Sequence, residues 1–203
     1  MIIAASAIVC LFFRPEFRDG KKKSEQVETL TLQYLNEDDR AYGLAGMALS
    51  AVALDASDLI SSISLDSEDN MVLFSDGYYF IGSPSVSPKA TWGSMVRNFQ
   101  ITSAMVVANL FARSLVRMKT AVPHDLLNTL HDEIIREGRE TCDLEDDEAE
   151  EVYSKALTYN RQIFGNTRLH PAIAKFAGAI SCRRTLSAQE ILDELSQLGI
   201  TAR

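Results

Sequence analysis

The sequence predicts a mainly helical α+β protein, in which about six helices surround a central apolar helix beside a small β-hairpin or three-stranded sheet. Three observations support this fold class. Residues 101–112 contain only three polar side chains, every pattern after residue 123 is helical, and an Asp-Gly pair at residues 76–77 lies between two apolar segments. A helix that is apolar on all sides lies inside a fold, so we expect residues 87–120 to form its centre.

The length and composition favour one intracellular domain. A chain of 203 residues can bury a sizeable core, so we expect residues 1–203 to form a single domain. The formal net charge of −8 argues against nucleic acid as a partner, because binding to phosphates needs clustered Lys and Arg. Cys10, Cys142 and Cys182 are widely spaced without a C-x-x-C pair, which predicts neither disulfides nor a zinc knuckle. A cytoplasmic location is the simplest expectation.

The N-terminal residues 1–13 are apolar except for Ser6, and a basic linker follows up to residue 23. The segment has no basic residue before the apolar run and is shorter than the roughly 20 residues of a membrane-spanning helix. We therefore expect a buried element. Its second half favours a strand, which we prefer, whereas Ala4, Ala5 and Ala7 favour a helix. The alternative is a membrane anchor, with the basic linker on the cytoplasmic side.

Residues 24–86 are predicted to contain two helices and a β-hairpin. An amphipathic helix over residues 24–35, capped by Ser24, is followed by a break at residues 36–40. The second helix, over residues 42–62, is rich in Gly, Ala and Ser, and small side chains let two helix axes approach closely. We expect it to pack tightly against the central helix.

The Asp-Gly pair predicts the hairpin, with strands over residues 71–74 and 78–81. In this register Phe74 lies opposite Tyr79. An isolated hairpin is only marginally stable, so a third strand is needed, and the N-terminal segment is the natural candidate.

The central helix is predicted to begin at Ser87, an N-cap followed by Pro88 at the first helical position. Arg113, Arg117 and Lys119 lie near its end, where positive charge complements the helix dipole. We interpret these basic residues as dipole partners. Asn109, inside the apolar run, needs a hydrogen-bond partner if it is buried.

Four further helices are predicted after the central one. They cover residues 123–137, ending at Gly138, then residues 145–164, 171–182 and 187–198. The acidic residues at the start of the second complement the positive end of a helix. Ser187 and Glu190 form an S-x-x-E capping box for the last one.

Two groups of residues are candidates for a binding site. His124, Asn128 and His131 lie within about 60° of one another on a helical wheel, and two imidazoles beside acidic residues can hold a metal or move protons. The commoner role of such histidines is structural. Tyr78, Tyr79 and Trp92 are candidates to line a pocket between hairpin and central helix.

The favoured function is that of an intracellular protein-interaction or assembly protein without catalytic activity, with a protein partner or a second copy of itself. Many apolar elements beside few convergent catalytic groups support this prediction. One alternative is a small metal-dependent or acid/base enzyme that uses His124 and His131. A third is a helical protein attached to a membrane through residues 1–13. The sequence indicates no cofactor and no established metal site.

Overall fold

The computed structural model describes residues 30–67, 71–79 and 87–199. Six α-helices and a small antiparallel sheet lie within these residues, so the predicted mainly α, α+β class is confirmed. The helices are α2 (Glu37–Ala53), α3 (Pro88–Phe111), α4 (His124–Cys142), α5 (Asp146–Phe164), α6 (His170–Arg183) and α7 (Ala188–Gln197). The strands are β1 (Ile60–Ser64), β2 (Val72–Phe74) and β3 (Thr185–Ser187).

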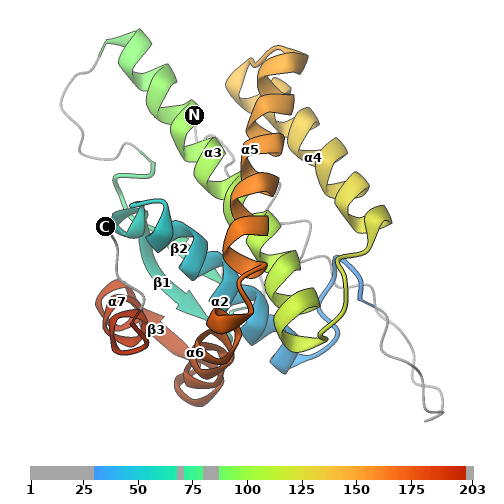
Figure 1. Cartoon of the computed structure of the whole chain (residues 1–203). Helices are drawn as coiled ribbons and strands as arrows, with labels where there is room; N and C mark the ends of the chain where they lie inside the picture. Colours follow the sequence, from blue (N-terminus) through green and yellow to red (C-terminus); the bar gives the residue numbers. More distant parts are fainter. Residues whose placement is uncertain (1–29, 68–70, 80–86, 200–203) are drawn as a thin grey trace.

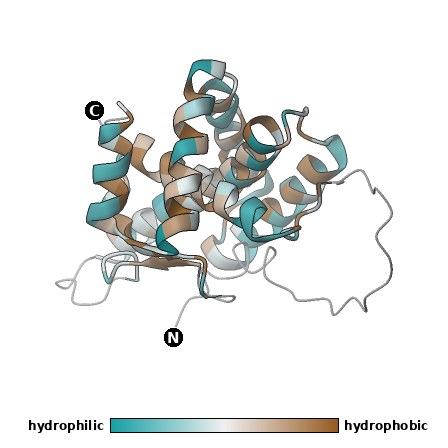
Figure 2. Ribbon diagram, turned by 90° about the horizontal axis from the view of Figure 1, so that it is seen from below, coloured by the Kyte–Doolittle hydropathy of each residue, from teal (hydrophilic) through white to brown (hydrophobic). Residues whose placement is uncertain are grey.

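Helix α3 runs through the middle of the molecule, as Figure 1 shows. Every residue from 101 to 114 is buried, which confirms the predicted apolar centre. The Ser87 side chain accepts a hydrogen bond from Ala90 N at 3.3 Å, so the predicted cap is also present. Helices α2 and α5 make the most extensive contacts with α3, which continues beyond Phe111 as a π-helical segment, η2 (Ala112–Arg117). In Figure 2 the hydrophobic faces of the helices turn inward and the polar faces outward.

Glycine allows α2 and α3 to pack closely. A Cβ atom on Gly46 would lie 2.5 Å from Ala108 O and 2.7 Å from Ala112 Cβ, so only glycine fits without displacing backbone. At Gly43 a Cβ atom would lie 2.6 Å from Asn109 Nδ2. The predicted close packing of the second helix on the central helix is therefore confirmed.

The start of α2 corrects the prediction for residues 24–40. Residues 24–29 lie outside the described residues, and residues 30–35 are not helical. Asn36 caps α2 by accepting a hydrogen bond from Asp39 N at 2.9 Å, so the polar stretch that was expected to break a helix begins one. Asn and Asp favour N-caps, and the acidic first turn complements the helix dipole.

The predicted helix over residues 42–62 is wrong beyond Ala53, where α2 ends. Asp55 adopts a left-handed conformation with φ of 55°, and the chain then forms β1. Ile60 and Ile63 of this strand are buried. Their β-branched side chains favour a strand that packs one face on a core.

The predicted β-hairpin at residues 76–77 is wrong in its strand pairing. β2 pairs antiparallel with β1, and the chain forms a turn over residues 76–79, while residues 80–81 of the predicted second strand lie outside the described residues. The Tyr78 ring stacks on Phe74 with centroids 4.1 Å apart, so Phe74 does not pair with Tyr79 across a ribbon. Asp-Gly suits many tight turns, and the dipeptide does not determine which strands pair.

The sheet has the order β2-β1-β3. β3 comes from residues 185–187, immediately before α7, and pairs antiparallel with β1 through Ile63 and Leu186. The third strand of the described sheet is thus β3. The segment that we expect in this position from the sequence, residues 1–13, lies outside the described residues.

The helices after α3 follow the predicted order. Helix α4 does not end at Gly138 but continues to Cys142, with Asp143 in a left-handed conformation after it. Gly138 is instead buried, where an added Cβ atom would lie 3.1 Å from the Phe99 ring. Helix α7 has the predicted capping box, since Ser187 N donates to Glu190 Oε2 at 2.9 Å.

Candidate functional site

The first three turns of α3 extend beyond the buried core and carry Trp92. This side chain is 45% exposed, one of few large hydrophobic residues in the described part that are so open to solvent. Its indole Nε1 donates a hydrogen bond to Cys142 O at 2.9 Å, across to the last residue of α4. Helix C-termini leave carbonyls without intrahelical partners, and Trp92 satisfies one of them. The contact holds the indole in one orientation while part of it faces solvent.

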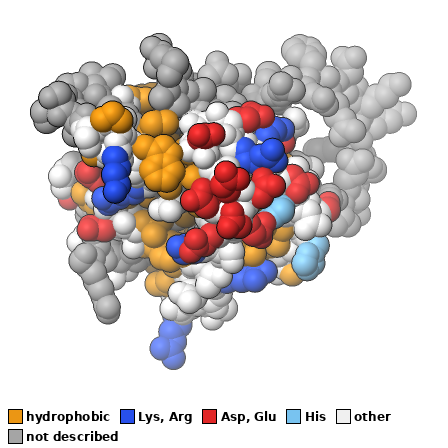
Figure 3. Space-filling view, turned by 90° about the horizontal axis from the view of Figure 1, so that it is seen from above, with side chains coloured by type: hydrophobic (Ala, Val, Ile, Leu, Met, Phe, Trp, Pro, Cys, Tyr) orange, Lys and Arg blue, Asp and Glu red, His pale blue; other side chains and the backbone are white. Residues whose placement is uncertain are grey.

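A groove of about 120 Å³ lies beside Trp92, between α3 and α5. We call it the Trp92 groove. Four apolar side chains and four polar ones line it: Trp92, Val96, Leu144 and Val152, with Gln100, Glu148, Glu151 and Lys155. Figure 3 views the face that carries the start of α3 and the α4–α5 connection, and it shows acidic side chains gathered beside a band of hydrophobic ones.

The acidic side chains come from the start of α5, where residues 145–151 include six carboxylates. Local structure accounts for some of them, because Glu145 N donates to Glu148 Oε2 at 3.0 Å in a capping box. Lys155 pairs with Glu151 at 2.7 Å, and both side chains remain about two-thirds exposed. Asp146 pairs with Arg139 at 3.2 Å and Glu150 with His131 at 2.6 Å, both on α4. The described lining of the groove itself has two carboxylates against one lysine, so its rim carries a small excess of negative charge.

His131 lines a second hollow, an open cleft of about 690 Å³ along α4 and the α4–α5 connection. Its Nδ1 lies 3.0 Å from Asp132 Oδ1, and its Nε2 lies 2.6 Å from Glu150 Oε2 on α5. The hydrogen bonds to Asp132 and then to Glu150 raise the pKa of His131 above its ordinary value. The imidazole also meets the Tyr153 ring edge-on at 4.9 Å. Together these contacts join α4 to α5.

The other histidine candidates are not part of this cleft. His124 is the first residue of α4 and is exposed, as is Asn128 one turn later. Of the three residues predicted as a site, only His131 contributes to the cleft lining. In the parts of the chain that the structure covers, no three His, Cys, Asp or Glu side chains are grouped to hold a metal ion.

The aromatic candidates separate into two places. The Tyr78 and Tyr79 rings meet edge-on at 5.1 Å, beside the β2 end of the sheet. Tyr78 is buried, which raises the pKa of its hydroxyl, whereas Tyr79 is 45% exposed. Trp92 contacts α4 instead. The two tyrosines therefore lie together, and Trp92 lies apart from them at the groove.

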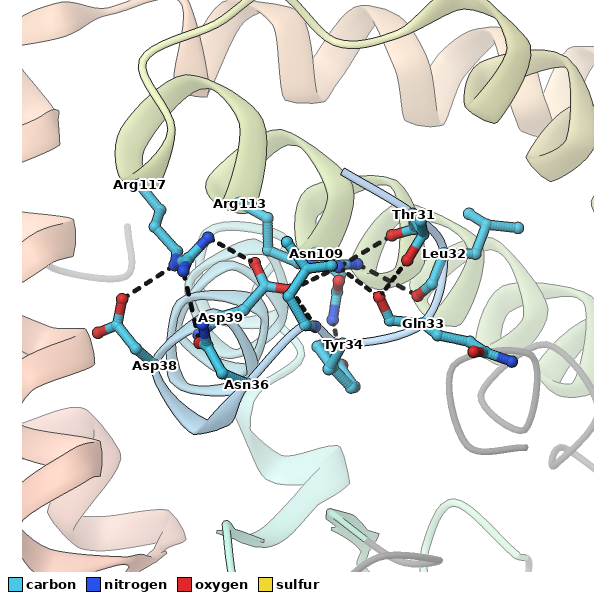
Figure 4. A network of polar contacts seen from close by, with 11 residues as sticks. Thr31, Leu32, Gln33, Tyr34, Asn36, Asp38, Asp39, Asn109, Arg113 and Arg117 are labelled. Carbon is cyan, nitrogen blue, oxygen red and sulfur yellow. Dashed lines mark hydrogen bonds and ion pairs between the residues drawn. The ribbon is translucent and has the colours of Figure 1, made fainter. Parts of the chain in front are cut away.

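A buried polar network joins the end of α3 to the start of α2, shown in Figure 4. Arg113 Nε and Nη2 donate to Asp39 Oδ2 at 2.9 Å and 2.6 Å, and neither side chain is exposed. The guanidinium also donates to the backbone carbonyls of residues 31–33. Our interpretation of Arg113 as a dipole partner is therefore wrong. Arg113 forms a buried ion pair with Asp39, and its guanidinium holds residues 31–33 in place. Arg117 pairs with the exposed Asp38 at 2.9 Å and also lies 3.5 Å from Oδ1 of the buried Asp39.

The amide of Asn109 belongs to the same region. Its Nδ2 donates to the Tyr34 hydroxyl at 2.6 Å, so the predicted partner for a buried amide is present. Burial raises the pKa of Tyr34 to about 12, although the nearby Arg113 acts in the opposite direction. The hydroxyl is neutral at physiological pH and can accept this bond.

Sequence reasoning missed three residues of these sites: Leu144 and Val152 of the groove, and Glu150 beside His131. Each of them lies on another element than the Trp92 or His131 side chain beside it. Arg113 carried a usable signal, since a charged residue directly after a wholly apolar run of a buried helix needs a charged partner.

One described helix, Pro88–Arg117, is long and apolar enough to cross a membrane, and 89% of its most apolar stretch is buried in the protein. The segment proposed as an anchor, residues 1–13, lies outside the described residues.

Comparisons of the chain with models of protein families, with curated proteins and with solved structures found no match. Function is therefore inferred from the geometry of the described residues.

Proposed function

We propose that this chain is an intracellular protein-interaction or assembly protein without catalytic activity, and that it binds its partner at the Trp92 groove. The observation that carries the proposal is the fixed, half-exposed indole of Trp92 in a groove lined by four apolar and four polar side chains. Interface residues that contribute most to affinity are enriched in Trp and lie in apolar pockets with polar surroundings.

The hydrogen bond from Trp92 to Cys142 O supports binding energetically. A flexible side chain loses about 0.5–1.5 kcal/mol of conformational freedom when an interface immobilises it. Trp92 is already held in the free protein, so a partner that covers it meets less of this cost. The indole N–H is also satisfied, and burial of the ring leaves no polar atom without a partner.

The size of the groove favours a protein side chain over a small molecule as its occupant. Pockets for small molecules usually measure about 300–1,000 Å³, whereas this groove measures about 120 Å³. A groove of this size accepts one or two side chains from a larger partner, with further contacts outside it.

Photo-crosslinking tests the proposal. A photoreactive phenylalanine in place of Gln100, which lines the groove, should form adducts with a partner protein in cells, and the same probe in place of the exposed Lys175 on α6 should not. Trp92→Ala in the Gln100 probe background should abolish the adducts. Light scattering then distinguishes a second copy from another protein. A strict monomer with no adduct above the Lys175 control would contradict the proposal.

A metal-dependent or acid/base function is a second candidate, and the position of His131 between two carboxylates in an open cleft favours it. A bound ligand raises the apparent stability by RT ln(1 + [L]/Kd), so a thermal-shift screen with divalent ions tests this candidate. A rise in melting temperature that His131→Ala abolishes would support it. No rise with any ion, together with an unchanged profile for His131→Ala, would remove it.

A further inference from the structure

We propose that the Trp92 groove recognises a basic amphipathic segment of a partner protein, with an apolar side chain in the groove and Arg or Lys side chains on its acidic rim. The inference rests on the proposed function and names the chemistry of the partner. Three properties of the groove carry it: its apolar floor, the sign of its charge, and the exposed face of Trp92.

The floor of the groove requires an apolar group. Val96 from α3, Leu144 from the α4–α5 connection and Val152 from α5 meet there with Trp92. Water against these four apolar side chains lacks hydrogen-bond partners on that side, so its replacement there by a Leu, Ile or Met side chain is favourable. Burial of such a side chain contributes most of the affinity that one small groove can supply.

The rim requires positive charge. Glu148 and Glu151 line the groove directly, whereas the carboxylates of residues 145–147 are not part of its lining, and Asp146 pairs with Arg139 at 3.2 Å. Among the described residues Lys155 is the one basic side chain of the lining, and it pairs with Glu151. The excess of carboxylates attracts a cationic segment from a distance and orients it before contact.

Trp92 adds a second preference for cations. A guanidinium or ammonium group is attracted to the face of an aromatic ring, most strongly to that of Trp. Trp92 lines the groove together with Glu148 and Glu151, so a partner cation bound there has both an aromatic ring and carboxylates among its neighbours. Arg fits this position better than Lys, since its planar group both stacks on rings and binds carboxylates in pairs.

The same charge argues against three other occupants. A symmetric contact with a second copy would place each acidic rim near another, in a chain whose net charge is already −8. Nucleic acid and anionic membrane surfaces are both negative and would be repelled. A basic amphipathic protein segment is the occupant that is compatible with the charge of the groove, its apolar side chains and the Trp92 ring.

The chain contains one tryptophan, so its fluorescence reports directly on the groove. The probe is a synthetic peptide of Leu and Arg with Leu at helical i, i+3 and i+4 spacing, titrated into the full chain. We expect the emission of Trp92 to shift to shorter wavelength, with saturation and with affinity that falls as salt rises. A peptide with Glu in place of every Arg should cause no shift.

Two charge-neutralising variants locate the site. Glu148→Gln with Glu151→Gln preserves side-chain shape and the capping position and should weaken peptide binding by about tenfold. The matched control, Asp125→Asn with Asp193→Asn, removes two exposed carboxylates outside the groove and should leave binding within about twofold. Trp92→Phe, measured by calorimetry, should also weaken binding.

Several results would overturn the proposal. These are equal binding of both peptides, equal loss in the two double variants, an emission shift that depends on the concentration of the protein alone, or a shift with vesicles of anionic lipid. Adducts from the Gln100 probe together with any of these results would leave the interaction function standing and refute only the basic partner. Absence of both adducts and peptide binding would refute both.

Discussion

The buried pair of Arg113 and Asp39 gives the sharpest test of how this fold is stabilised. Arg113→Met keeps much of the side-chain volume but removes the charge, leaving Asp39 in a site where its side chain is fully buried. It also leaves the carbonyls of residues 31–33 without their donor. Removing one member of a buried ion pair costs about 3–5 kcal/mol, so we expect the free energy of unfolding to fall by this amount.

Removing the charge of Asp39 instead of that of Arg113 should lower the free energy of unfolding by less, because more of the hydrogen bonds remain. In Asp39→Asn the guanidinium keeps its three backbone acceptors, and the Asn oxygen can still accept from Leu35 N, which lies 3.0 Å from Asp39 Oδ2. The loss is then that of the charge in the contact with Arg113 and in the longer, 3.5 Å contact with Arg117, about 1.5–3 kcal/mol. The double variant should cost less than the two single losses together, with a coupling energy of about 2 kcal/mol.

Urea unfolding followed by circular dichroism measures all three variants. The matched control is Arg139→Met, because Arg139 and its partner Asp146, 3.2 Å away, are 60% and 77% exposed and lie outside this network, so their pair should contribute less than about 1 kcal/mol. Amide exchange at Leu35, whose N–H bonds to Asp39, should rise in the Asp39 and Arg113 variants. Equal losses in Arg113→Met and Arg139→Met, or a coupling energy near zero, would refute the reasoning.

The remaining predictions concern pH, helix packing and a helix cap. The pKa of His131 is raised in the folded state, so protonated His131 stabilises the fold at low pH and this contribution is lost as pH rises above about 6.5. His131→Gln should therefore reduce the decline in unfolding free energy over that range, and an unchanged decline in urea titrations would contradict the assignment. Gly46→Ala should destabilise by about 1–3 kcal/mol through contact with Ala108 O. Gly178→Ala on α6, where nothing lies near an added Cβ, should instead stabilise by about 0.5–1 kcal/mol, and thermal unfolding compares the two. Ser187→Ala should cost about 1 kcal/mol in the same assay, and no loss would show that the capping box contributes nothing.

The parts of the fold that could be predicted from sequence depend on partners close along the chain. Ser87 and Ser187 cap helices through backbone groups three residues away, so their patterns are visible in a short window. The apolar run of α3 is itself a continuous segment. The predictions failed where an element is decided by a distant partner. Strand β1 is an example, because residues 60–64 pair with β3, far along the chain, and a window of helical spacing does not contain that information.

The candidate site was hard to predict for the same reason, and one helix boundary illustrates it. Gly138 is a reasonable C-terminal signal, but it is buried against Phe99, so α4 continues to Cys142. Only because α4 has this extra turn does the carbonyl of Cys142 reach Trp92, fifty residues away in sequence. A helix ending at Gly138 would leave Trp92 without this acceptor, as a mobile surface residue rather than a fixed one. The tertiary packing of a single glycine therefore determines whether the start of α3 presents a rigid aromatic surface, and the proposed interaction site depends on that packing more than on any local motif.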